Sequence, residues 1–191
     1  PLKPRDKRPL MAWKEYQTRM ATPEELRTWF LDTDNNVGIV TGALSNLTIV
    51  DCDSAEAIAF FEQTCLAEGA TVETYRVQTP KGLHYYYQFV EGSSNFQAKK
   101  EWPGVDLRSE GGYVAAPPSI HPSGRAYEVM TQAMPAIAPQ WLFTATSPAI
   151  ASSSAKDSPE DDLFAPCAAG GRNMALTRLA GSLLVDLPFS K

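Results

Sequence analysis

Short apolar or alternating runs, separated by turn-forming residues, fill most of the first 130 positions of the chain. Runs of this length, bounded by Gly, Pro, Asn, Asp or Ser, are typical of strands, because alternate side chains of a strand face opposite sides of its sheet. Seven strands are predicted, at residues 37–40, 47–50, 75–79, 84–89, 105–109, 113–116 and 126–129.

Two segments instead space their apolar residues as helices do. Thr22 can cap the first helix, with Pro23 in the first turn and Glu25 three residues after the cap, as in a capping box. Ser54 can cap the second helix, which should run over residues 55–68. Its inward-facing side should carry Ile58, Phe61 and either Cys65 or Leu66.

Strands that outnumber helices predict an α+β fold over residues 1–146, with a mixed, mostly antiparallel sheet and flanking helices. Residues 147–166 are rich in Ser, Pro, Ala and acidic side chains, which is typical of a flexible linker. Residues 167–191 carry leucines at helical spacing and are predicted to begin a second, helical domain. The chain starts at Pro1 without Met, so we expect it to be a fragment of a longer protein.

The composition indicates a folded protein that does not enter a membrane. Apolar residues make up 43% of the chain and aromatic residues 10%, which excludes a disordered class. No apolar run approaches the roughly 18 residues of a membrane span, and no signal peptide is visible, so we expect a cytoplasmic protein. The three cysteines have no CxxC spacing, which argues against both structural zinc and a disulfide framework.

The net charge of −5 counts against a nucleic-acid-binding protein, which is usually basic. Two features weaken this objection. Carboxylates that bind divalent ions are counted as bare charge, although the bound ions would invert the local field. Basic residues also gather near the N-terminus, at Lys3, Arg5, Lys7 and Arg8.

The main chemical feature is Asp51-Cys52-Asp53 at the end of an apolar strand. Side chains two apart on a strand point the same way, so both carboxylates should project at a solvent-facing edge, with Cys52 on the packed side. Two hard oxygen donors suit Mg²⁺ or Mn²⁺. The alternative is that both aspartates are turn or capping residues.

A second acidic candidate, Asp106, alternates with Val105 and Leu107 on a predicted strand and shares its face with Arg108. Asp106 can complete a metal site as its third carboxylate, and Arg108 can contact a phosphate bidentately. The alternative is an ion pair between Asp106 and Arg108 on an exposed strand face.

A third candidate is the turn around Pro80-Lys81-Gly82, which delivers Lys81 and turn amides beside His84. This set suits a triphosphate, although a single histidine is more often structural. Gly112, next to Gly111, can allow close approach of a ligand or can form a turn. His121 lies in a loop rich in Pro, Ser and Gly, where it is either functional or only part of the loop.

Several of these pieces are motifs that follow one another in order over about residues 3–130. They are Lys7-Arg8-Pro9 before Trp13, Asn36-Val37-Gly38-Ile39-Val40-Thr41-Gly42, Ile49-Val50-Asp51-Cys52-Asp53, Thr79-Pro80-Lys81-Gly82-Leu83-His84, Pro103-Gly104-Val105-Asp106-Leu107-Arg108, and Gly111-Gly112-Tyr113 through His121-Pro122-Ser123-Gly124. Together they resemble the primase-polymerase family (bifunctional DNA primase/polymerase, N-terminal domain) of the archaeo-eukaryotic primase superfamily. Members of this family occur in replication proteins of plasmids, phages and integrated elements.

The resemblance implies a primase-like α+β core in which the catalytic metals are held by Asp51, Asp53 and Asp106. It also implies that His84 contacts the phosphates of the incoming nucleotide, with Lys81 and Arg108 as helpers. Relatives often carry Ser two residues before this histidine, and Gly82 stands there in this chain, so that hydroxyl contact is absent or replaced. Residues 171–181 resemble the opening of the helical domain that follows such cores.

We therefore predict a nucleotidyltransferase that uses two metals to add nucleoside or deoxynucleoside triphosphates to a primer on a DNA template. A helicase domain or protein outside this chain is an expected partner, in a prokaryotic cell or on a virus or plasmid. A metal-dependent nuclease is one alternative, although the basic group at Lys81, His84 and Arg108 favours a triphosphate. A non-catalytic nucleic-acid or nucleotide-binding replication module is the other, although three intact carboxylates argue against it.

Overall fold

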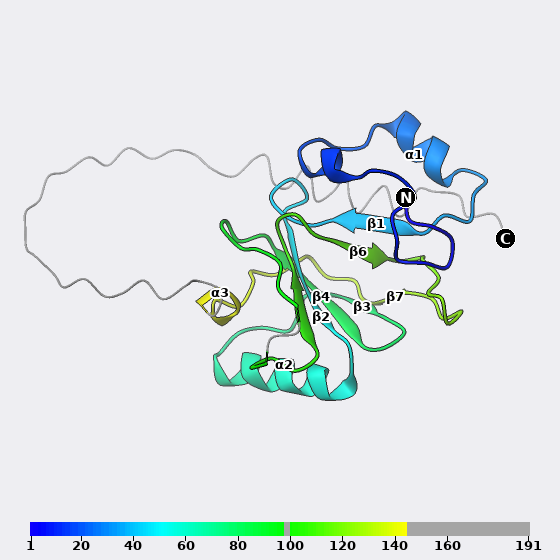
Figure 1. The fold of residues 1–191 in the computed structure, drawn as a ribbon. Coiled ribbons are helices and arrows are strands. Elements are labelled where there is room, and N and C mark those ends of the chain that lie inside the picture. Colours follow the sequence, from blue (N-terminus) through cyan, green and yellow to red (C-terminus); the bar gives the residue numbers. More distant parts are fainter. Residues whose placement is uncertain (98–99, 145–191) are drawn as a thin grey trace, which may run out of the picture. The chain divides into compact units, whose positions relative to one another are not determined.

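The computed structural model describes residues 1–97 and 100–144, as a mixed α+β fold (Figure 1). Its helical elements are the 3₁₀ turn η1 (Lys14–Gln17), α1 (Pro23–Phe30), α2 (Ala55–Ala67) and α3 (Trp141–Thr144). Its strands are β1 (Val37–Val40), β2 (Leu47–Cys52), β3 (Tyr75–Gln78), β4 (Leu83–Gln88), β5 (Val105–Arg108), β6 (Tyr113–Ala116) and β7 (Glu128–Thr131).

Five of the strands form the central sheet in the order β5-β2-β4-β3-β7, and every neighbouring pair is antiparallel. The other two, β1 and β6, form a separate antiparallel pair. Strand β2 therefore lies between β5 and β4, although β5 is more than fifty residues away from it in the sequence. The predicted α+β class with a mostly antiparallel sheet is confirmed.

One face of the central sheet packs against α2, which runs below it in Figure 1. Phe61 and Cys65 of the helix are fully buried against alternate residues of the strands. Burying a side chain of the size of Phe61 contributes about 2–3 kcal/mol. The strand residues in this layer are Val50, Cys52, Leu83, Tyr85, Tyr87, Val105 and Leu107.

The opposite face carries a second apolar layer, formed with β6 and the N-terminus (Figure 1). Ile49, Val77 and Tyr86 of the central sheet pack there with Leu2, Val114, Ala115 and Tyr127. Because a strand alternates its side chains, this face also receives the polar residues that are in phase with Ile49 and Tyr86. These are Asp51, His84, Asp106 and Arg108, which therefore lie between two layers instead of on an open surface.

The capping box predicted for α1 is present: the Thr22 hydroxyl accepts from the Glu25 N–H, and the Glu25 carboxylate accepts from the Thr22 N–H. Ser54 likewise caps α2. Of the two candidates for its inward face, Cys65 is buried, whereas Leu66 is 81% exposed. The last strand begins at Glu128 instead of residue 126, because it pairs at the sheet edge with β3 through an irregular register.

None of the helices in the described part of the chain has the length and apolar character needed to cross a bilayer. The predicted linker at residues 147–166 and the predicted helical segment at residues 167–191 lie outside the described residues. The predicted domain boundaries therefore stay predictions.

Candidate active site

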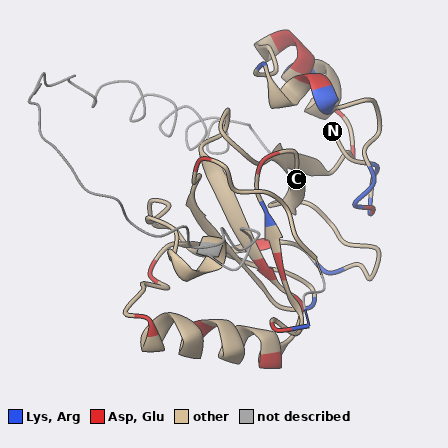
Figure 2. Ribbon diagram, turned by 60° about the vertical axis from the view of Figure 1, so that its left-hand side comes forward, with Lys and Arg blue, Asp and Glu red and all other residues tan. Residues whose placement is uncertain are grey.

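Three polar side chains lie in one row across the central sheet. Asp51 on β2 stands directly opposite Asp106 on β5 and directly opposite His84 on β4. Residues opposite each other in an antiparallel pair project to the same face. The row therefore brings together three residues that the sequence analysis selected from separate segments, and Figure 2 shows the acidic positions in neighbouring strands at the middle of the fold.

Asp51 is more enclosed than the sequence analysis expected. Its relative exposure is 8%, so the prediction that it stands at a solvent-facing edge is wrong. The reason is that β1, β6 and the N-terminus cover this face of the sheet. The Asp51 carboxylate lies 3.3 Å from Nε2 of His84, which is 3% exposed.

The pKa of Asp51 reflects two opposed effects. Burial alone would raise it, but the hydrogen bond from His84 and the positive charges of His84, Lys7 and Arg108 outweigh burial and hold it below its ordinary value. Asp51 is therefore an anion at neutral pH. Nδ1 of the His84 ring is buried and has no hydrogen-bond partner in the described part of the chain.

Asp53 follows directly after β2 and is exposed, as the sequence analysis expected. Its backbone N–H donates to the carbonyl of Gly104 at 2.9 Å, which ties the end of β2 to the loop before β5. Partial desolvation raises the pKa of Asp53, and the negative charges of Asp51 and Asp106 raise it further. The three carboxylates are thus close enough to repel one another.

Asp106 and Arg108 share one face of β5, while Val105 and Leu107 are fully buried on the other, as predicted. Nη2 of Arg108 donates to the Asp106 carboxylate at 3.0 Å. The predicted alternative of an ion pair is therefore present, in a partly buried setting. With its amide oxygen turned toward the guanidinium, Gln97 also accepts from Arg108.

The three carboxylates fit a hard divalent cation in their chemistry and in their place along the sheet. Two like charges directly opposite each other on paired strands destabilise a sheet, and a bound cation would remove that cost. In the arrangement described, however, Asp51 faces His84 and Asp106 faces Arg108. Among the residues that the structure describes, no three His, Cys, Asp or Glu side chains form a ready metal site.

The turn between β3 and β4 places Lys81 at the surface and Gly82 in the interior. The N–H groups of Lys81 and Gly82 point to the Thr79 hydroxyl, at 3.3 and 2.9 Å, so these two amides are bonded within the turn instead of open to a phosphate. A Cβ on Gly82 would lie 1.9 Å from the carbonyl oxygen of Cys52. This contact explains why a serine cannot stand here in this backbone arrangement.

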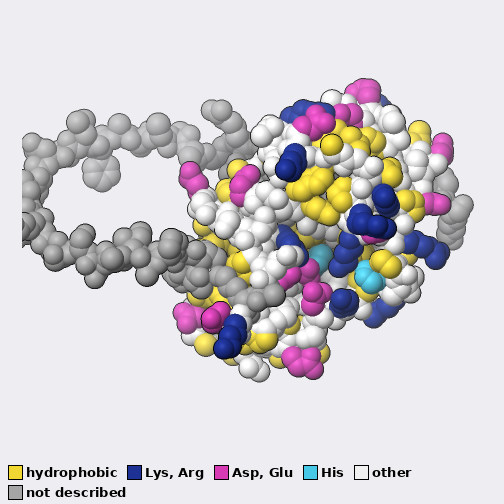
Figure 3. All heavy atoms as spheres, viewed as in Figure 1, with side chains coloured by type: hydrophobic (Ala, Val, Ile, Leu, Met, Phe, Trp, Pro, Cys, Tyr) yellow, Lys and Arg dark blue, Asp and Glu magenta, His cyan; other side chains and the backbone are white. Residues whose placement is uncertain are grey.

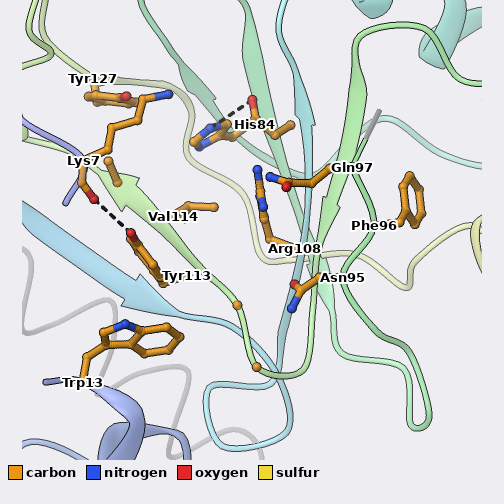
Figure 4. Close-up of a pocket in the computed structure, with 14 residues that line it drawn as sticks. Lys7, Trp13, His84, Asn95, Phe96, Gln97, Arg108, Tyr113, Val114 and Tyr127 are labelled. Atoms are coloured by element: carbon orange, nitrogen blue, oxygen red, sulfur yellow. Dashed lines mark hydrogen bonds and ion pairs between the residues drawn. The ribbon is translucent and has the colours of Figure 1, made fainter. Parts of the chain in front are cut away.

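A pocket of about 560 Å³ opens beside the row of polar residues (Figure 4). Asp51, His84 and Arg108 line it from the central sheet, and Gln97 lies beside the Arg108 guanidinium. A volume in this range accommodates a small organic ligand of nucleotide size. The other lining residues are Lys7, Trp13, Asn95, Phe96, Gly111, Gly112, Tyr113, Val114, Ala115 and Tyr127.

Several lining residues escaped the sequence analysis as site candidates, notably Trp13, Asn95, Phe96, Gln97 and Tyr127. They come from the N-terminal segment, the loop before β5 and the loop before β7. Lys7 and Trp13 belong to the first motif of the resemblance, and Lys7 also to the basic cluster, but neither is a site candidate there. Asn95, Phe96, Gln97 and Tyr127 belong to no pattern that points to a site, because only the folded chain brings their segments together.

The loop candidates Gly112 and His121 have structural roles of their own. Gly112 lines the pocket, but the space that its missing side chain leaves is filled by Asn95 and Thr41. His121 is half-buried near the pocket, and its Nδ1 accepts from the Ser123 N–H. Desolvation lowers the pKa of His121, and the charges of Lys7 and Lys81 lower it further.

Basic side chains gather at this side of the molecule in spite of the net negative charge. Lys and Arg side chains surround the visible histidine atoms in Figure 3. Lys7 and Lys81 are both near enough to act on the titration of Asp53 and His121. Arg125 joins them from the loop before β7, where its guanidinium donates to the Pro80 carbonyl at 2.6 Å.

Comparison with known families gives one match that covers most of the chain. A family model described as "Bifunctional DNA primase/polymerase, N-terminal" matches residues 1–141. This range includes every residue of the row and of the pocket, and also the basic rim, which we define as Lys7, Lys81 and Arg125. No curated protein matches the chain.

Proposed function

The chain belongs to the bifunctional DNA primase/polymerase, N-terminal family, and on this premise we propose that its pocket binds a nucleoside triphosphate and joins it to a primer strand. Family membership establishes a function of the DNA primase/polymerase type and hence DNA and nucleotides as substrates. The template-directed transfer, its two divalent metals and the role of each residue are the proposal.

The observation that carries the proposal is the row of Asp106, Asp51 and His84 on one face of the sheet, of which Asp51 and His84 line a pocket of nucleotide size. Separate segments of the chain supply two carboxylates and a histidine. The register of β2 with β4 and with β5 places them opposite one another. Each carboxylate has a basic partner, His84 for Asp51 and Arg108 for Asp106. Two carboxylates directly opposite each other still repel, and a cation shared between them would remove that cost.

We assign Asp51, Asp53 and Asp106 as ligands of Mg²⁺ or Mn²⁺. Bound ions of this kind activate an attacking hydroxyl and neutralise charge on the transferring phosphoryl group. The lowered pKa of Asp51 keeps that carboxylate charged at neutral pH. To ligate an ion, Asp51 and Asp106 must turn from His84 and Arg108, which sets these two basic groups free to face the substrate.

The phosphates of the nucleotide would lie against His84 and Arg108, with Lys81 at the rim. Arg108 is half-buried and lines the pocket, so a bidentate contact with a phosphate is shielded from water and correspondingly strong. His84 lines the same pocket, and its buried Nδ1, which has no hydrogen-bond partner among the described residues, would donate to a phosphate oxygen when the ring is protonated. Lys81 is exposed and would contribute mainly charge.

The remaining parts of the proposal concern the setting of the reaction. We propose that the enzyme acts in replication of a plasmid, phage or integrated element, together with a helicase domain or protein, in the cytoplasm of a prokaryotic host. These points extend the resemblance of the motifs and have no support from the contacts described above.

Primer extension tests the reaction. The chain is incubated with a labelled primer on a DNA template, deoxynucleoside triphosphates, and either Mg²⁺ or Mn²⁺. We expect extension that EDTA abolishes, and Asp53→Asn should reduce it at least about 100-fold, since one ligand of the reacting centre is lost. Asn is the appropriate replacement because it keeps the size of the side chain and one acceptor oxygen, and removes the negative charge.

Asp34→Asn is the matched control, because Asp34 is an exposed aspartate in the turn before β1, away from the row. It should extend primers as the unchanged protein does. Absence of extension by the unchanged protein with either metal would contradict the proposal, and shortening of the primer would instead support a nuclease. Extension by Asp53→Asn at the level of Asp34→Asn would remove Asp53 from the metal site.

A further inference from the structure

Tyr127 carries a buried polar atom that the fold leaves unused. The residue is 2% exposed and lines the pocket, and its hydroxyl has no hydrogen-bond partner among the described residues. Leaving a buried hydroxyl unpaired costs about 1–3 kcal/mol, so such a group needs an explanation. The Tyr127 ring could pack equally well as phenylalanine, which suggests that its hydroxyl serves a ligand.

The surroundings of Tyr127 indicate what kind of ligand that is. Its ring lies 6.1 Å from the His84 ring, between centroids. Burial raises the pKa of Tyr127 to about 12, and the negative charges of Asp51 and Asp53 add to this effect. The hydroxyl is therefore protonated at neutral pH and can donate a hydrogen bond close to the carboxylates of the proposed reacting centre.

Lys7 lies at the same end of the pocket and extends toward Tyr127 in Figure 4. Its charge reaches Asp51, Asp53 and His121, as their pKa values indicate. The position of Lys7 depends on the N-terminal loop, which we define as residues 1–9.

The N-terminal loop is held in place by several specific contacts. Leu2 is buried in the second apolar layer and exchanges backbone hydrogen bonds with Asn36. The Lys7 carbonyl accepts from the Tyr113 hydroxyl at 3.1 Å, as the dashed line in Figure 4 marks. An anchored loop presents Lys7 to the pocket at a lower entropic cost than a free terminus would.

We propose that Lys7 and the Tyr127 hydroxyl together bind the phosphate chain of the incoming nucleotide, so that the N-terminal loop forms part of the substrate site. The inference rests on the function proposed above. A triphosphate is favoured over the backbone of the template strand because both residues line the same pocket as Asp51, a carboxylate of the proposed reacting centre. The ammonium of Lys7 would contribute charge, and the Tyr127 hydroxyl a directed hydrogen bond.

Equilibrium binding tests the inference without turnover. Binding of a deoxynucleoside triphosphate, of inorganic tripolyphosphate, of the deoxynucleoside alone and of a short single-stranded oligonucleotide is measured with Mg²⁺ and no primer. Lys7→Met and Tyr127→Phe should each weaken binding of the triphosphate and of tripolyphosphate by about tenfold, as expected for one hydrogen bond to a charged group. Their affinity for the deoxynucleoside should be unchanged.

Lys3→Met is the matched control, since Lys3 belongs to the same loop and is exposed but does not line the pocket. It should change tripolyphosphate binding less than twofold. An equal effect of Lys3→Met and Lys7→Met would overturn the inference in favour of unspecific attraction. Weaker oligonucleotide binding with unchanged tripolyphosphate binding would overturn it in favour of a template contact.

Failure of the inference and failure of the proposed function give different results. If the unchanged protein extends primers while Lys7→Met and Tyr127→Phe bind tripolyphosphate as it does, only the present inference is wrong. If the unchanged protein extends no primer with either metal, the proposed function is wrong, whatever the binding measurements give. Tyr127→Phe should keep the free energy of unfolding within about 1 kcal/mol, because it removes a hydroxyl without a partner.

Discussion

At the scale of single residues, tertiary contacts that the sequence does not reveal explain why glycine stands at position 82 and why Asp51 is buried. Gly82 stands where relatives often carry serine. The structure gives the physical cause: the backbone of the turn passes so close to the Cys52 carbonyl that no side chain fits. The strand pattern predicts Asp51 at an exposed edge, whereas β6 and the N-terminal loop bury it.

Gly82→Ala should therefore strongly destabilise the protein. The new Cβ would lie 1.9 Å from the Cys52 carbonyl oxygen and 3.2 Å from the Ser54 backbone nitrogen. The backbone would therefore have to shift at Cys52, between the proposed metal ligands Asp51 and Asp53. We expect the free energy of unfolding, measured in urea, to fall by about 3 kcal/mol or more.

Gly69→Ala provides the comparison for Gly82→Ala. Gly69 has a φ of +65° and nothing within 4 Å of an added Cβ, so only the left-handed backbone conformation is penalised, at about 1 kcal/mol. If Gly82→Ala costs no more than Gly69→Ala, the turn can move away from Cys52 and the steric explanation is wrong.

At the scale of elements, local signals and tertiary contacts agree best in α1. The capping box predicted from Thr22 and Glu25 is formed, and Arg19 adds two hydrogen bonds to the Glu25 carboxylate, at 2.7 and 2.8 Å. The hydrogen bonds from Arg19, followed by that from the Thr22 N–H, lower the pKa of Glu25 from its ordinary 4.5 to about 2. The capping-box pattern does not include Arg19, because this residue lies before the helix and its side chain extends forward to Glu25.

This arrangement predicts a pH dependence of stability. A carboxyl group with a lowered pKa in the folded state stabilises the protein above its unfolded pKa, and the contribution is lost as pH falls through the folded value. The stabilisation by Glu25 should thus be complete above about pH 4.5 and disappear toward about pH 2. The difference in unfolding free energy between the unchanged protein and Glu25→Gln, measured in urea from pH 6 to pH 2, should shrink over this range.

Glu24→Gln serves as the control for Glu25→Gln. Glu24 precedes Glu25 in the same helical turn and is exposed, with only a distant ion pair to Arg27 at 3.8 Å. Its effect on stability should be small over the same pH range. An effect of Glu25→Gln that does not vary with pH would show that the Arg19 contact contributes nothing to folding.

At the scale of the whole molecule, the pocket is lined by segments that are distant in sequence. Asn36, before β1, is buried at their junction. Its side-chain amide donates to the carbonyls of Asp6 and Ile120, at 3.0 and 2.7 Å, and accepts from the Ile120 N–H at 2.8 Å. One residue thereby ties the N-terminal loop, which carries Lys7, to the loop that carries His121.

Asn36→Ala should weaken both the fold and the phosphate site. Loss of three buried hydrogen bonds, with their partners left unpaired, should lower the free energy of unfolding by about 3 kcal/mol. Tripolyphosphate binding at a temperature where the variant is folded should also weaken, because Lys7 loses its anchor. Asn35→Ala is the neighbouring control. Within residues 1–97 and 100–144, the Asn35 side-chain amide bonds only to the Trp29 carbonyl, so stability should fall slightly and binding should not change.

Normal tripolyphosphate binding by folded Asn36→Ala would mean that Leu2 and Tyr113 suffice to position the N-terminal loop. Together with Lys7→Met, this variant therefore separates the position of Lys7 from its charge. Comparing tripolyphosphate binding by Asn36→Ala and Lys7→Met also tests whether the basic rim binds phosphate through fixed side-chain positions or only through its overall positive charge.

The sequence by itself determined the α+β class, the strands near the site and the candidates Asp51, Asp53, Asp106 and His84. These features depend on local periodicity, capping and residue chemistry, which a linear pattern contains. Only the tertiary structure decided that Asp106 and His84 stand on either side of Asp51, that Asp51 is buried, and that Lys7 and Tyr127 share its pocket. The reason is physical: strand order and register are set by how two apolar layers pack across the whole chain, and no single segment contains that information.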